Sequence, residues 1–225
     1  MTANTQEAGP AGQIVEAARV LSSLGLVAAF GHVSARTDDG FVITPAADLA
    51  VVDEDQLVAV PLSAAALPAG APGEAWLHVA LYRARPDVEA IVRAQPPAAF
   101  AAAASGKTLH PLYGQACWLG TRLPVYDDAR PVRSPALAEA AARAMPDGEA
   151  LLLRGNGAAT VGDTPGLAVA RMWLLAAACQ TWTSTHPDER HGLNDAEIAS
   201  WRAVSGELLP RLWAHLNRRC LRDRP

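Results

Sequence analysis

The sequence predicts a single α/β domain in which helices flank a mixed β-sheet. Apolar runs of strand length alternate with amphipathic or alanine-rich helical segments along the chain. No internal repeat and no linker divides the 225 residues, half of which are hydrophobic, so one large core can form. We expect residues 1–10 to be a flexible N-terminal tail and residues 11–225 to form the domain.

The first half of the chain is expected to alternate helices with short strands. An amphipathic helix precedes Gly25, which is placed to end it. Asp38-Asp39-Gly40 has the composition of a hairpin turn. A later helix must stop before Pro86, because the residue before a proline disfavours helical backbone. The expected elements are helices at 13–24, 74–84 and 96–105, strands at 33–36, 41–44, 57–60 and 88–92, and a loop at 64–73.

Helix starts in the second half are marked by capping residues. Ser134-Pro135 and Thr164-Pro165 each place a hydroxyl cap before a proline in the first turn. Asn194 and Glu197 form a predicted capping box, and the final helix is expected to kink near Pro210. The other expected elements are strands at 123–126, 150–153 and 158–161, with Gly155-Asn156-Gly157 as the turn between the last two.

The composition argues against several classes of partner. A formal net charge of −4 disfavours nucleic acid or an anionic membrane as the main partner. Cys117, Cys179 and Cys220 form neither a metal signature nor a disulfide framework, which suits a reducing cytoplasm. The chain shows no signal peptide and no apolar stretch long enough to span a bilayer. We therefore expect a cytoplasmic protein that binds a small molecule.

Four segments, in order, carry a resemblance to the class II aldolase/adducin family. GHVSAR at 31–36 resembles the family's G-N-x-S-x-R turn, and ITP at 43–45 resembles its I-T-P-S-G turn. EAWLHVALYRARPDVEAIV at 74–92 resembles E-x-x-x-H-x-x-I-Y-x-x-R-P-D-V-x-A-V-V, and LRGNGAATVG at 153–162 resembles L-x-x-H-G-x-x-x-x-G. The resemblance implies a central, largely antiparallel sheet flanked by helices, and a homotetramer with its sites between subunits.

The metal ligands of the family are replaced in this chain. The family follows its buried strand with H-T-H-P, where this chain has Arg93-Ala94-Gln95-Pro96, and its third histidine is here Asn156. Zinc and similar ions need neutral imidazole, thiolate or carboxylate donors, and arginine has no free lone pair. We therefore expect neither a metal nor another cofactor. A substitute metal site remains an alternative, built from His32, Glu74, His78 and His110.

The resemblance assigns roles to the remaining polar residues. Glu74 corresponds to the family's acid/base carboxylate, and His78 lies four residues later on the same helix face. Arg93 stands where a metal cation would stand and could stabilise developing negative charge. We expect these three residues to be catalytic, although each could have a structural role. The expected substrate-binding residues are His32, Ser34, Thr44, Gln95, His110 and Asn156.

The phosphate-binding features of the sugar-phosphate aldolases are missing. The T-P-S-G turn reads Thr44-Pro45-Ala46-Ala47, and the serine pair before the glutamate reads Pro72-Gly73. The pattern is closer to the decarboxylase-like branch. We expect a metal-independent lyase of a biosynthetic pathway that makes or breaks a carbon–carbon bond in a small unphosphorylated carboxylate or carbonyl compound. The reaction would be a decarboxylation, an aldol-type reaction or an enolate-mediated cyclisation. The alternative is a non-catalytic binding or structural module, as in the adducin branch.

Overall fold

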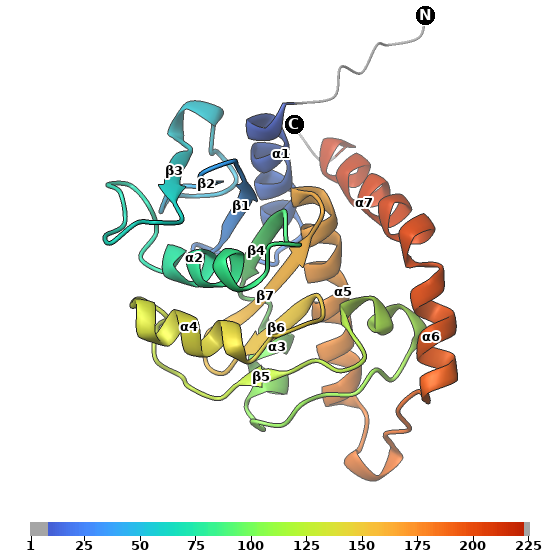
Figure 1. Ribbon diagram of the computed structural model, residues 1–225. Helices are drawn as coiled ribbons and strands as arrows, with labels where there is room; N and C mark the ends of the chain where they lie inside the picture. The colour runs from blue at the N-terminus through green and yellow to red at the C-terminus, as the bar shows by residue number, and fades with distance from the viewer. Residues whose placement is uncertain (1–8, 223–225) are drawn as a thin grey trace, which may run out of the picture.

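A computed structural model describes residues 9–222 and contains one seven-stranded sheet with the order β3-β2-β1-β4-β7-β6-β5 (Figure 1). Neighbouring strands pair antiparallel except β5 and β6, which are parallel. The predicted mixed, largely antiparallel sheet is therefore confirmed. The strands are β1 (His32–Arg36), β2 (Gly40–Ile43), β3 (Val58–Pro61), β4 (Ala90–Ala94), β5 (Val125–Tyr126), β6 (Ala150–Leu153) and β7 (Gly157–Gly162).

Helices cover both faces of the sheet, because successive strand residues point to opposite sides. Figure 1 shows α2 and α4 on one side and α5 and α7 on the other. Val92 packs in the larger core under α1, α3, α5 and α7, whereas Ile91 packs in the smaller core under α2 and α4. The helices are α1 (Pro10–Ser23), α2 (Ala75–Ala84), α3 (Pro97–Ala103), α4 (Pro135–Arg143), α5 (Pro165–Ser184), α6 (Asp195–Ala203) and α7 (Ser205–Arg222). Within residues 9–222, none of these helices has the length and hydropathy needed to cross a membrane.

The predicted helix starts are confirmed by their hydrogen bonds. Ser134 Oγ accepts from Leu137 N at 3.5 Å, and Thr164 Oγ1 accepts from the corresponding amide of α5 at 3.2 Å. The capping box of α6 is reciprocal: the Glu197 amide donates to Asn194 Oδ1 at 3.0 Å, and the Asn194 amide donates to Glu197 Oε2 at 2.9 Å. At the N-terminus, α1 begins at Pro10 rather than at residue 13, because proline fits the first helical turn. The predicted tail at residues 1–10 therefore overlaps α1 at Pro10, and its residues 1–8 lie outside the described part of the chain.

The prediction of one final helix kinked near Pro210 was wrong. Two helices, α6 and α7, meet at Val204, whose backbone leaves the helical region at φ −98° and ψ 0°. The hydroxyl of Ser205 donates to the Arg202 carbonyl at 2.7 Å, which satisfies a group at the end of α6. Pro210 lies inside α7. Proline has no N–H to donate to the carbonyl of Gly206, four residues earlier. Gly206 is exposed, so water can bond to that carbonyl instead.

One corner of the sheet brings distant segments together. His32 on β1 pairs with Arg93 on β4, and Arg93 pairs on its other side with Ala159 on β7. The tight turn between β6 and β7 contains Asn156 and ends at Gly157, whose φ of +89° is a conformation that favours glycine. The turn therefore delivers Asn156 to the same end of the sheet as His32 and Arg93.

Gly157→Ala tests whether this turn depends on glycine. A β-carbon would overlap the Ala94 carbonyl oxygen, and the positive φ adds strain. We expect the free energy of unfolding to fall by about 2–4 kcal/mol, measured by urea denaturation. Gly206→Ala is the matched control, because nothing lies within 4 Å of its added carbon. If both variants unfold at the same urea concentration, the turn does not need its glycine.

Candidate active site

A polar pocket of about 360 Å³ opens at the corner where β1, β4 and the β6–β7 turn meet. Small residues leave it open on one side, among them Ala46, Ala47 and Gly73. Its polar lining comes from strands and turns that are far apart in the sequence. The side chains that carry its charge and hydrogen-bonding capacity are His32, Glu74, Arg93, Gln95, Arg133 and Asn156.

Arg93 is buried at the base of this pocket, with 1% of its surface exposed. Its Nη2 lies 3.0 Å from Glu74 Oε2. The same nitrogen donates to two oxygens of Asn156, the backbone carbonyl at 3.0 Å and the side-chain Oδ1. Its Nη1 donates to the Phe30 carbonyl at 3.3 Å. Burial lowers the pKa of Arg93, while Glu74 opposes that shift. A guanidinium stays protonated in proteins, so Arg93 is a fixed positive charge.

Asn156 links the two charged residues. Its Nδ2 donates to Glu74 Oε1 at 2.5 Å, while its side-chain oxygen accepts from Arg93. Gln95 Nε2 lies 3.4 Å from the same oxygen. Both carboxylate oxygens of Glu74 therefore face a donor. The network fixes the orientation of Glu74 at the start of α2.

The donor set does not fit a metal ion. Arg93, Gln95 and Asn156 lie together in one cluster, but a guanidinium offers no lone pair and its charge repels a cation. Among residues 9–222, no three His, Cys, Asp or Glu side chains are grouped so that they could hold a metal. The alternative set of His32, Glu74, His78 and His110 therefore does not assemble in this chain.

Two neutral histidines lie next to the pocket. The ring centroids of His32 and His78 are 5.7 Å apart, and of the two residues only His32 lines the pocket. Ser34 Oγ lies 2.8 Å from both His78 Nδ1 and the Tyr82 hydroxyl. Burial, with help from the charge of Arg93, lowers the pKa of His78 to about 3. Burial, His78 and the nearby arginines hold the pKa of His32 well below its usual value.

The structure brings five of the predicted site residues to the pocket and leaves four outside it. Those that line it are His32, Glu74, Arg93, Gln95 and Asn156. Ser34 and His78 are fully buried behind His32. Thr44 is also buried, and its hydroxyl accepts from the Val33 amide at 3.2 Å. His110 is exposed and lies beside a separate cavity with Tyr113.

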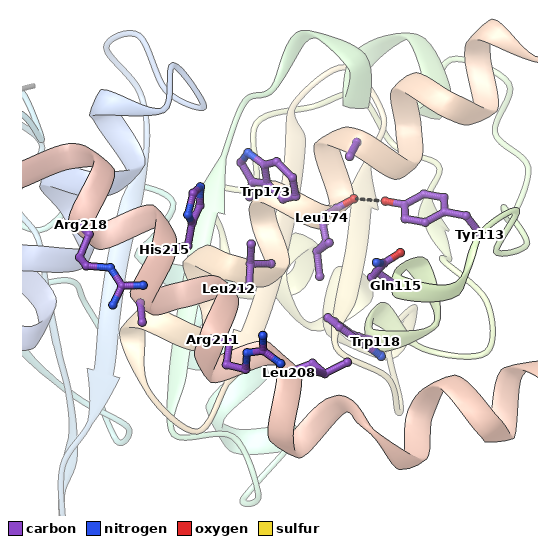
Figure 2. A pocket seen from close by; sticks show the side chains of 12 residues that line it. Tyr113, Gln115, Trp118, Trp173, Leu174, Leu208, Arg211, Leu212, His215 and Arg218 are labelled. Atoms are coloured by element: carbon purple, nitrogen blue, oxygen red, sulfur yellow. Dashed lines mark hydrogen bonds between the residues drawn. The ribbon is translucent and has the colours of Figure 1, made fainter. Parts of the chain in front are cut away.

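A larger groove of about 810 Å³ lies between α5, α7 and the segment 113–119 (Figure 2). It is mainly apolar, and Trp118 and Trp173 contribute to it. Tyr113 lines the groove and donates to the Leu174 carbonyl at 3.3 Å. None of the predicted catalytic residues lies there. The basic side chains on its lining, Arg211, His215 and Arg218, are exposed, whereas the buried Arg93 lies at the smaller pocket.

Sequence reasoning did not identify Arg133 and Phe30 as pocket residues. Arg133 precedes α4 and lies over Gly73, and Phe30 is 67% exposed at the pocket edge. Neither belongs to a distinctive motif. Phe30 directly precedes the G-H-V-S segment, which is the one local signal that could have pointed to it. Only tertiary packing places Arg133 beside the start of α2.

Residues 12–183 match the family model described as the Class II Aldolase and Adducin N-terminal domain. The chain is 36% identical, over 171 residues, to a 3,4-dihydroxyphthalate decarboxylase from Arthrobacter keyseri, covering 67% of this chain and 68% of that protein. It is 31% identical over 177 residues to a 3,4-dihydroxyphthalate decarboxylase from a Terrabacter species, covering 70% and 73%.

Solved structures show the same fold. An L-fuculose-1-phosphate aldolase from Thermus thermophilus superposes with a TM-score of 0.69 at 29% identity, covering 77% of this chain and 92% of that one. An L-fuculose 1-phosphate aldolase from Glaciozyma antarctica gives a TM-score of 0.78 at 19% identity, covering 94% and 88%. The fold expectation is therefore confirmed.

The buried His78 makes stability depend on pH in a defined direction. Its pKa is lowered to about 3 in the folded protein, so only the unfolded chain binds its proton between that value and about 6.5. Stability is therefore lost as pH falls below about 6.5, by about 2 kcal/mol at pH 5 relative to pH 7 from this residue. We expect His78→Asn to reduce this acid dependence, measured by urea denaturation across pH 5–7. The exposed His191→Asn is the control and should keep the wild-type profile; equal profiles for all three proteins would contradict the prediction.

Proposed function

The chain belongs to the class II aldolase and adducin family and is a lyase-type enzyme, and we propose that it decarboxylates a small unphosphorylated carboxylate without a metal. Two relatives that it matches over two thirds of their length are named as decarboxylases. The observation that supports the metal-free part is the cluster of Arg93, Gln95 and Asn156, the residues that replace the metal ligands implied by the family resemblance, with Arg93 and Asn156 both bonded to Glu74. A hydroxylated aromatic carboxylate is the substrate class that these relatives suggest.

In this proposal Arg93 takes over the electrostatic part of the metal's role. A metal bound there would supply positive charge to a developing anion. Arg93 supplies a fixed positive charge but cannot coordinate an oxygen. Its nearest acidic partner is Glu74, at 3.0 Å. The guanidinium therefore offsets negative charge on Glu74 and on the substrate next to it.

Glu74 is the proposed proton carrier. It takes the proton of a substrate hydroxyl and passes it to the carbon that bears the carboxylate. The carbon–carbon bond then breaks, its electron pair returns to the ring, and CO2 leaves. The product remains as a phenolate, which takes a proton from water. This sequence conserves charge and requires neither an oxidant nor a reductant.

The neighbouring groups have orienting roles in this scheme. Asn156 Nδ2 keeps Glu74 directed toward the pocket, and Gln95 supports Asn156. His32 is neutral at physiological pH and presents a hydrogen-bonding ring at the pocket wall. His78 does not line the pocket, so it is a positioning residue that packs against His32.

The shape of the pocket supports an enzyme over a non-catalytic module. A scaffold that had lost its activity could fill this space with side chains, whereas here about 360 Å³ remains open around convergent polar groups. The homotetramer implied by the family resemblance and the biosynthetic role expected from the sequence stay part of the proposal. Analytical ultracentrifugation tests the first of these directly.

Metal content tests the metal-free mechanism. We expect only substoichiometric zinc, iron, manganese or nickel in the protein purified without chelators from metal-supplemented cells, measured by inductively coupled plasma mass spectrometry. The triple variant Arg93→His/Gln95→His/Asn156→His is the positive control, because it restores three imidazoles to one cluster and should bind a divalent metal. Near-stoichiometric metal in the wild type would show that other ligands hold it.

CO2 release tests the reaction. A panel of hydroxylated aromatic mono- and dicarboxylates, including 3,4-dihydroxyphthalate, is incubated with the enzyme in the presence of EDTA. We expect release from at least one member and a loss of at least about a hundredfold in kcat/KM for Glu74→Gln, because the proton carrier is removed. The exposed Glu139→Gln is the control. No CO2 from any compound, or full activity in Glu74→Gln, would contradict the proposal.

A further inference from the structure

We propose that Arg133 binds the carboxylate that the substrate keeps, at the mouth of the candidate pocket. This inference rests on the proposed decarboxylation, since it distinguishes the retained carboxylate from the one released as CO2. It assigns a substrate-anchoring role to a residue outside the family motifs. It also defines the substrate class as a small dicarboxylic acid.

The charges of the pocket identify Arg133 as its available cation. Arg93 is positive, but Glu74 lies 3.0 Å away and compensates that charge. His32 is neutral, because its pKa is held well below the usual value. Within the described residues 9–222, Arg133 makes no ion pair with any carboxylate. The lining therefore carries one uncompensated positive charge, and a substrate anion is its complement.

The side chain of Arg133 lies across the turn that precedes Glu74. A β-carbon added to Gly73 would be 2.9 Å from Arg133 Nε and 3.4 Å from Cζ. The absence of a side chain at Gly73 therefore makes room for the guanidinium beside the pocket. This placement also explains why the charge of Arg133 contributes to the lowered pKa of His32.

The backbone around Arg133 is fixed on both sides. Val132 is 1% exposed and belongs to the smaller core. The Arg133 amide donates to the Pro131 carbonyl at 2.8 Å, and Ser134 caps α4. A guanidinium on this fixed backbone can bind a ligand at the mouth of the pocket with little loss of backbone freedom.

Electrostatics decides which carboxylate Arg133 holds. A carboxylate that leaves as CO2 loses its charge in the transition state, so a cation paired with it stabilises the substrate more than the transition state. Such a pair would slow the reaction. A carboxylate that stays keeps its charge throughout, and a cation can hold it without that penalty. Arg133 at the mouth suits the retained group, while the reacting carbon lies deeper, beside Glu74.

The apolar residues at the mouth of the pocket indicate that the part of the substrate between its charged groups and the solvent is apolar. Phe30, 67% exposed, offers a ring at the edge of the pocket, and Ala46 and Ala47 add small apolar surface. An aromatic ring that carries two carboxylates would bring an apolar face to these residues and a charged group to Arg133. The proposed substrate is therefore a planar dicarboxylate rather than a sugar acid.

Binding of non-reactive probes tests the anchor without requiring catalysis. Benzoate, phthalate and the neutral benzamide are titrated by calorimetry at low ionic strength. We expect the wild type to bind both anions at least about tenfold more tightly than benzamide, and Arg133→Gln to remove that difference. Arg133→Lys should retain part of it, because charge remains but the guanidinium fork is lost. The control is Arg130→Gln in the same segment, whose arginine is already paired with Asp128.

A second variant and a kinetic readout separate anchoring from a general effect on folding. Gly73→Ala keeps the charge but displaces the guanidinium, so it should weaken both anions relative to benzamide. With a decarboxylated dicarboxylate, Arg133→Gln should raise KM about tenfold and leave kcat nearly unchanged, as expected for uniform binding. Equal affinity of the wild type for benzoate and benzamide, unchanged anion binding in Arg133→Gln, or a fall in kcat alone would overturn the inference. A normal binding result without CO2 release would instead count against the proposed reaction.

Discussion

The buried ion pair between Arg93 and Glu74 is the interaction on which the site depends. A guanidinium with 1% of its surface exposed needs a compensating charge, and Glu74 at 3.0 Å supplies it. Asn156 bonds to both partners and ties the β6–β7 turn to β4 and α2. Because three distant segments meet through these contacts, the pair organises the end of the sheet as well as the chemistry.

The fixed positive charge also determines the state of the nearby histidines. Burial disfavours an imidazolium at His32 and His78, and Arg93 adds repulsion to both. Both rings are therefore neutral under physiological conditions. Ser34 and Tyr82 continue the polar contacts from His78 into the smaller core. The site thus combines the Arg93–Glu74 ion pair with two neutral imidazole rings.

Replacing a metal by an arginine changes what a site of this fold can do. A metal can bind two substrate oxygens directly and polarise them. An arginine gives only directed hydrogen bonds and charge, and here most of its donors already contact Glu74, Asn156 and Phe30. The proposed function therefore relies on a proton carrier and on a separate cation for binding. That division of roles is the basis for assigning base chemistry to Glu74 and substrate anchoring to Arg133.

Local sequence signals were sufficient for much of the fold and for part of the site. Caps at Ser134, Thr164 and Asn194 act within one helical turn, so their residues alone predicted the starts of α4, α5 and α6. Pro210 misled the prediction, because the helix break is made by the backbone at Val204 and the Ser205 hydroxyl.

The sequence by itself determined the strand and helix order, the family resemblance and the replacement of three metal ligands by Arg93, Gln95 and Asn156. Only the tertiary structure decided which polar residues share a pocket. Strand pairing and helix packing place Ser34, Thr44 and His78 behind the lining and His110 beside another cavity. They also bring Arg133 over Gly73, about sixty residues away in the chain. Such contacts depend on long-range packing, which no local pattern of residues encodes.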